Sequence, residues 1–139
     1  MDLVSHMLRS ATPLLWDGGV GTGLCAAGLD LAVEPPEAWL LRHPEAVAEL
    51  HAGFARAGAD VLQTNTFGLL RLAVSAQLPG EMAELVAAAV RLCREAARQS
   101  PREIEVVATL GPTGAAHPGA LGRDGRAQRG GAPSIEAAA

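Results

Sequence analysis

Residues 14–23 read LLWDGGVGTG, a short apolar run that stops at Asp17 and continues directly into glycines. The run predicts a buried strand over residues 13–17. The glycines predict a turn that a ligand can approach closely, because glycine has no side chain and permits positive φ. In parallel sheets and α/β barrels, ligands bind beside the carboxyl ends of the strands, so Asp17 stands where a ligand site is expected. The alternative is that Asp17 only hydrogen-bonds its own turn, as aspartate often does.

The glycine pattern fits neither of the common phosphate-binding motifs. A dinucleotide fingerprint needs a third glycine where this chain has Leu24, and a phosphate loop needs a lysine that is missing here. An acid at the beginning of the loop would also repel phosphate. Asp17 instead suits a ligand that carries a positive group, such as an ammonium.

The composition is that of one globular domain. The chain has 139 residues, of which 49% are hydrophobic and 19% are charged. A net charge of −4 and an aromatic content of 3% provide neither a basic face nor a stacking platform for nucleic acid. No apolar run approaches the roughly 20 residues that cross a bilayer. Two cysteines far apart in the sequence do not form a disulfide framework. We therefore expect a cytoplasmic protein with free thiols, no nucleic-acid partner and no membrane partner.

Helical and strand patterns alternate along the chain. Pro44 at a first helical position and Gly58 as a stop predict a helix over residues 44–57, with His51 at its surface. An apolar stripe that includes Cys93 predicts a second long helix over 81–99. Shorter helical turns are expected over 24–31, 38–41 and 69–77, and further buried strands over 60–67 and 104–110.

This order of strand, helix, strand, helix, strand predicts an α/β fold with three parallel strands and right-handed crossover helices. Each strand ends in polar residues or glycines, and in a parallel sheet these ends lie along one edge. Three converging ends indicate a ligand site better than any one of them. The ends are Asp17-Gly18, Thr64-Asn65-Thr66 and Gly111-Pro112-Thr113.

We divide the chain into a leader over residues 1–12, a folded part over 13–114 and a tail over 115–139. Glycine, alanine and arginine dominate the tail, and the apolar periodicity stops there. This composition predicts disorder, because such a segment has little apolar surface to bury.

Four motifs in order resemble the amino-terminal part of the homocysteine S-methyltransferase family, which includes the homocysteine-binding module of methionine synthase and betaine–homocysteine methyltransferase. The resemblance covers residues 14 to 114. The motifs are DGGVGT at 17–22, HPEAV at 43–47 with His51, AGADV at 57–61 running into TNTF at 64–67, and LGPTG at 110–114.

The resemblance implies a (β/α)8 TIM barrel that binds homocysteine at its C-terminal face, of which this chain supplies the N-terminal portion. It implies that Asp17 accepts a hydrogen bond from the substrate ammonium. The backbone N–H groups of Gly18, Gly19 and Val20 would meet the substrate carboxylate, and Thr64, Asn65 and Thr66 would line the same mouth. Family members hold zinc on three cysteine thiolates, and the substrate thiolate attacks a methyl donor.

A complete barrel of this type needs about 250 residues, so we expect this chain to be an incomplete one. Cys25 and Cys93 do not match the family's zinc cysteines, which lie in later strands. We therefore expect no catalytic or metal-ligating residue, no zinc bound by this chain alone, and no activity in isolation. Two alternatives remain: a non-catalytic interaction module that pairs through its open sheet edge, and a small flavodoxin-like ligand-binding domain.

Overall fold

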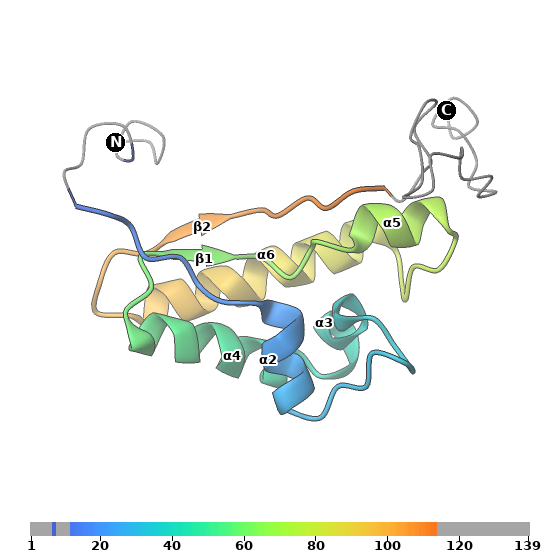
Figure 1. The fold of residues 1–139 in the computed structure, drawn as a ribbon, viewed down its shortest axis with the longest axis horizontal. Helices are drawn as coiled ribbons and strands as arrows, with labels where there is room; N and C mark the ends of the chain where they lie inside the picture. The colour runs from blue at the N-terminus through green and yellow to red at the C-terminus, as the bar shows by residue number, and fades with distance from the viewer. Residues whose placement is uncertain (1–6, 8–11, 114–139) are drawn as a thin grey trace, which may run out of the picture.

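The computed structural model describes residue 7 and residues 12–113. The predicted leader, apart from Met7 and Thr12, and the predicted tail lie outside this range. The described chain alternates helices with a small parallel sheet (Figure 1), which confirms the α/β class. Its elements are α2 (Val20–Ala26), η1 (Pro36–Ala38), α3 (Trp39–Arg42), α4 (Pro44–Ala57), β1 (Val61–Gln63), α5 (Leu69–Val74), α6 (Met82–Gln99) and β2 (Glu105–Val107).

The sheet is smaller than the sequence pattern predicts. β1 pairs in parallel with β2, with Leu62 opposite Val106. The strand expected over 13–17 is present only as an isolated parallel bridge between Trp16 and Val61. One reason is that the N–H of Leu15 donates to the Asp60 carboxylate, at 2.9 Å, rather than to a neighbouring strand.

β1 ends at Gln63, well before the predicted limit of residue 67. The Thr64 and Thr66 hydroxyls bond each other at 2.8 Å, and the Thr66 N–H donates to the Thr64 carbonyl at 2.9 Å. Threonine side chains and local turns of this kind compete with ladder pairing. The polar tip of the predicted strand is therefore a loop that leads from the sheet edge to α5.

Helices α4 and α6 lie on the same face of the sheet (Figure 1), as expected for the crossovers of a parallel sheet. Leu62 and Val106 from the strands pack there against Ala55 of α4 and Cys93 of α6. Both helices were predicted almost to the residue. Gly58 ends α4 with φ of 104° and donates its N–H to the Ala55 carbonyl, as a left-handed C-terminal glycine does.

Helix α2 corrects the expectation of a long glycine turn. The helix begins at Val20 rather than Leu24, so only Gly18 and Gly19 separate it from the first strand. Glycine in this helix serves close packing: a Cβ on Gly23 would lie 2.6 Å from Leu50 Cδ1. Among the described glycines, positive φ occurs at Gly28 and Gly58, and not in the 18–23 segment.

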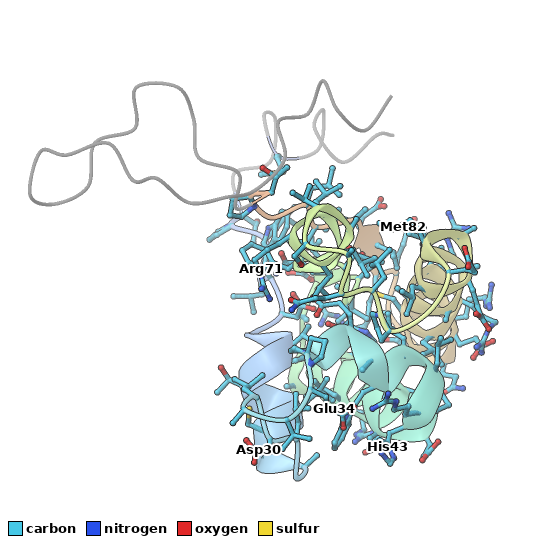
Figure 2. The ribbon with its side chains drawn as sticks, turned by 90° about the vertical axis from the view of Figure 1, so that its right-hand side faces the viewer. Asp30, Glu34, His43, Arg71 and Met82 are labelled. Atoms are coloured by element: carbon cyan, nitrogen blue, oxygen red, sulfur yellow. The ribbon has the colours of Figure 1, made fainter. Side chains whose placement is uncertain are left out.

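A second apolar core joins α2, α3, α4, α5 and α6 at the end of the molecule that faces the viewer in Figure 2. Glu34 lies at the edge of this core. Its carboxylate accepts the indole N–H of Trp39 at 2.9 Å and the guanidinium of Arg42 at 2.7 Å. These bonds attach the 27–35 loop to α3. None of the helices in the described part of the chain is long and apolar enough to cross a membrane.

Candidate functional site

The ends of the first strand and of β1 meet through Asp17. The Asp17 carboxylate accepts two hydrogen bonds from Gln63, one from its backbone N–H at 2.8 Å and one from its side-chain Nε2 at 2.9 Å. The alternative in which Asp17 bonds its own turn is therefore not what the structure shows. Asp17 instead reaches across to the neighbouring strand and is only half-buried.

The segment that follows β2 completes this edge. The Thr66 hydroxyl donates to the Thr109 carbonyl at 2.7 Å, and the Thr109 hydroxyl donates to Gln63 Oε1 at 3.1 Å. Further along, the Gly111 N–H donates to the Phe67 carbonyl at 3.0 Å. Gly111 must be glycine here, because a Cβ would lie 2.4 Å from that carbonyl oxygen. The structure thus brings all three predicted strand ends together.

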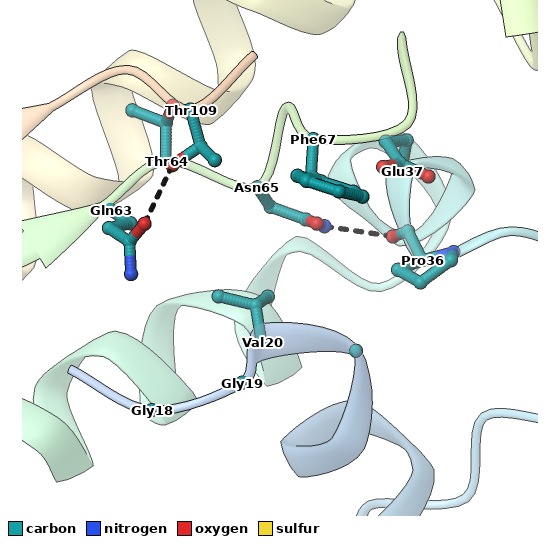
Figure 3. A pocket seen from close by; sticks show the side chains of 11 residues that line it. Gly18, Gly19, Val20, Pro36, Glu37, Gln63, Thr64, Asn65, Phe67 and Thr109 are labelled. Carbon is teal, nitrogen blue, oxygen red and sulfur yellow. Dashed lines mark hydrogen bonds between the residues drawn. The ribbon is translucent and has the colours of Figure 1, made fainter. Parts of the chain in front are cut away.

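A cavity of about 280 Å³ opens beside these strand ends (Figure 3). Its walls combine backbone from the glycine segment, apolar side chains and a few amide and hydroxyl groups, a mixture typical of small-molecule sites. The lining residues are Gly18, Gly19, Val20, Gly21, Pro36, Glu37, Gln63, Thr64, Asn65, Phe67 and Thr109.

The predicted site residues divide into two groups at this cavity. Gly18, Gly19, Val20, Thr64 and Asn65 line it. The other two predicted residues stand just behind the wall. The Thr66 hydroxyl points to the Thr109 carbonyl, and the Asp17 carboxylate contacts Gln63, which is itself a lining residue.

The opposite wall comes from a segment that the sequence interpretation missed. Asn65 Nδ2 donates to the Pro36 carbonyl at 2.9 Å, a bond visible in Figure 3. Glu37 is 3% exposed, and its Oε1 accepts the Gly68 N–H at 2.6 Å. A Cβ on Gly68 would lie 2.6 Å from that same oxygen, so any larger residue there would displace the Glu37 carboxylate. The signal for this segment in the sequence is the Pro35-Pro36 pair directly before Glu37.

His51 is buried, so the prediction that it lies at the surface of its helix is wrong. The buried row of α4 consists of Val47, His51 and Ala55, spaced four residues apart. Neither ring nitrogen of His51 has a hydrogen-bond partner within residues 12–113 or Met7. Burial lowers the pKa of His51, and the Asp17 carboxylate opposes that shift in part. The imidazole is therefore neutral near pH 7.

Cys93 of α6 lies in the core stripe, as predicted. Burial raises the pKa of its thiol to about 12, and the negative charge of Asp17 adds to that shift. A thiol with such a pKa is a poor metal ligand, because metals bind the thiolate. Among the described residues, no cluster of three or more His, Cys, Asp or Glu side chains could hold a metal ion. These residues therefore do not fit the zinc site that the resemblance implies.

Comparison with known proteins agrees with the motifs. The sequence model of the homocysteine S-methyltransferase family matches residues 14–134, which extends beyond the four motifs. The fold is similar to that of the homocysteine methyltransferase MmuM from Escherichia coli. The metallated form is 27% identical over 81% of this chain and 42% of that chain, with a TM-score of 0.63. The oxidized form is 26% identical over 82% and 42%, with a TM-score of 0.64. This chain thus spans less than half the length of that protein.

Proposed function

Because this chain belongs to the homocysteine S-methyltransferase family, we propose that it binds the amino-acid end of homocysteine. In this proposal it forms part of a site that transfers a methyl group from a donor to the homocysteine sulfur, giving methionine. The fold proposed for that site is a (β/α)8 barrel of which this chain is the N-terminal portion. The observation that carries the proposal is the cavity beside the Asp17 strand end.

The chemistry of this edge suits an α-amino acid. A carboxylate has about four acceptor positions, and Gln63 occupies one on each Asp17 oxygen, so Asp17 keeps capacity for an ammonium donor. Gly18, Gly19 and Val20 follow directly and line the cavity, and the two glycines add no side chain to its wall. We assign the substrate ammonium to Asp17 and the substrate carboxylate to the backbone N–H groups of these three residues.

The sulfur end of the substrate would extend past Thr64 and Asn65, with Thr66 supporting their loop through its bond to Thr109. Methyl transfer needs the thiolate, and a homocysteine thiol with a pKa of roughly 8.5 is mostly protonated at pH 7. The described residues do not fit zinc, so the proposal gives them no part in activating the thiol. In the proposal, thiolate activation belongs to the later strands of the barrel, where the resemblance places the zinc cysteines. We also propose a cytoplasmic location, a proposal that the two free thiols support.

Calorimetric titration with L-homocysteine under reducing conditions tests this assignment. The Asp17→Asn variant keeps the shape of the side chain and removes its charge. Loss of a charge-assisted hydrogen bond costs about 1.5–3 kcal/mol, so we expect affinity to fall roughly tenfold to a hundredfold. Asp30→Asn is the matched control, because Asp30 is exposed and its carboxylate accepts the Ala32 N–H within its own loop. Equal affinity in the wild type and Asp17→Asn would refute the role of Asp17.

A further inference from the structure

We propose that Gln63 is a positioning residue that holds the Asp17 carboxylate ready for a ligand ammonium group, and that the Thr109 hydroxyl holds Gln63 in turn. This inference rests on the proposed function, because it takes the ligand to be an α-amino acid such as homocysteine. It goes further by assigning a role to two residues that the family motifs do not single out.

Gln63 donates two hydrogen bonds to the Asp17 carboxylate, and we call this pair of bonds the clamp. Its backbone N–H donates to Oδ2 at 2.8 Å and its side-chain Nε2 donates to Oδ1 at 2.9 Å. Because one residue bonds both oxygens, the carboxylate can neither rotate about its own axis nor swing away without breaking a bond. The backbone donor is part of β1, so this half of the clamp is as rigid as the sheet itself.

The orientation of the Gln63 amide follows from its partners. A carboxylate only accepts hydrogen bonds, so the amide must present its NH₂ group to Asp17 and its oxygen to the other side. On that side the Thr109 hydroxyl donates to Oε1 at 3.1 Å, the bond drawn at the left of Figure 3. A flipped amide would set oxygen against oxygen at Asp17. The three segments are therefore connected by two hydrogen bonds that run in one direction. Thr109 donates to Gln63, and Gln63 donates to Asp17.

This chain of bonds lies directly beside the cavity. Gln63 and Thr109 both line it, and Asp17 stands immediately behind Gln63 with acceptor capacity left on both oxygens. A carboxylate already held in place costs the incoming ligand less ordering than a free one. Ordering one flexible side chain weakens binding by up to about tenfold, which sets the size of the expected effect.

The test compares two ligands that differ only in the ammonium group, L-homocysteine and 4-mercaptobutanoate, titrated into the full chain under reducing conditions. Gln63→Met removes the Nε2 donor and keeps the backbone N–H and the approximate shape. Thr109→Val removes the hydroxyl that orients the amide. Gln99→Met is the matched control, because it makes the same chemical change at an exposed position at the end of α6.

We expect Gln63→Met to weaken L-homocysteine about tenfold and to leave 4-mercaptobutanoate unchanged, since Gln63 acts on the ligand only through Asp17. Thr109→Val should give a smaller loss with the same ligand dependence, and Gln99→Met should give none. An equal loss for both ligands would show a merely structural role for Gln63 and overturn the inference. An unchanged affinity for L-homocysteine would overturn it as well.

Measurements on the ligand-free protein separate this inference from the proposed function. Exchange of the Gln63 side-chain amide protons, followed by ¹⁵N NMR, should be slower than for Gln99 and should accelerate in Thr109→Val. Fast exchange in the wild type would show that the clamp does not exist. If exchange is slow but the wild type binds neither ligand, the proposed function fails, and the ligand-directed role of Gln63 fails with it.

Discussion

Because the imidazole of His51 is buried, we expect the stability of the fold to decrease as the pH is lowered below 6.5. The side chain is 0% exposed, and neither ring nitrogen has a hydrogen-bond partner among the described residues. Burial lowers its pKa below the ordinary value of 6.5, so the folded protein keeps the ring neutral while the unfolded chain accepts a proton. Stability is therefore full above pH 6.5 and is lost as the pH falls toward the lowered pKa of the folded state.

The size of the effect follows from linkage. When only the unfolded state is protonated, stability falls by about 1.4 kcal/mol for each pH unit well below 6.5. Between pH 7.5 and 5.5 the loss of stability is therefore at most about 1.4 kcal/mol, a limit set by the unfolded state alone. The Asp17 carboxylate reduces the loss, because it favours the protonated ring.

His51→Leu isolates this contribution. The variant removes an unsatisfied buried polar group, which costs about 1–3 kcal/mol, so at pH 7.5 we expect it to be more stable by about 1 kcal/mol. The advantage should grow when the pH is lowered to 5.5, by at most about 1.4 kcal/mol. Urea denaturation followed by circular dichroism at several pH values measures both numbers. The other titratable groups are common to both proteins, so their contributions cancel in the difference.

His43→Gln serves as the control, because His43 is exposed and lies against Trp39 with the ring centroids 4.6 Å apart. Its stability difference from the wild type should not grow on acidification as that of His51→Leu does. The reasoning would be refuted if the difference between wild type and His51→Leu were the same at pH 7.5 and 5.5.

Three further predictions follow from packing, burial and the missing metal ligands. Gly23→Ala should destabilise the fold by about 1–3 kcal/mol, because its Cβ would lie 2.6 Å from Leu50. Gly53→Ala in α4 should stabilise the fold by about 0.5–1 kcal/mol, because alanine favours the helix and its Cβ meets no close neighbour. Changes of the opposite sign in the free energy of unfolding, measured by urea denaturation, would contradict this. Iodoacetamide should label half-buried Cys25 before Cys93, whose thiol pKa is about 12, and equal rates by mass spectrometry would count against the burial of Cys93. The 139-residue chain should retain less than one zinc per chain after dialysis and form no methionine from homocysteine with common donors, and stoichiometric zinc with turnover would overturn that expectation.

The sequence was most informative where local chemistry decides the structure. Pro44 and Gly58 bound α4 as predicted, because a first-turn proline and a left-handed terminal glycine act within a few residues. The predicted strand ends meet because the carboxyl ends of parallel strands lie along the same edge of the sheet. The prediction for His51 was wrong, because the buried row of α4 runs through Val47, His51 and Ala55 and thus includes a polar side chain.

The parts that could not be predicted depend on contacts between distant segments. Gln63 is recognisable as a clamp only once Asp17, 46 positions away, lies beside it. Glu37 forms the far wall of the cavity because it bonds the Gly68 N–H, a pairing across 31 positions. The glycines after Asp17 were assigned to a turn because glycine favours turns, but tight packing of α2 against Leu50 explains Gly23 instead.

The most direct test of the central claim is to map L-homocysteine onto the full ¹⁵N-labelled chain by NMR titration under reducing conditions. The account predicts saturable shifts of the backbone amides of Gly18, Gly19 and Val20, together with those of the 64–66 loop, and predicts that Asp17→Asn weakens them at least tenfold. The claim would be contradicted by shifts that do not saturate. It would equally be contradicted by shifts confined to the separate groove between the 31–36 loop and α5, near Arg71.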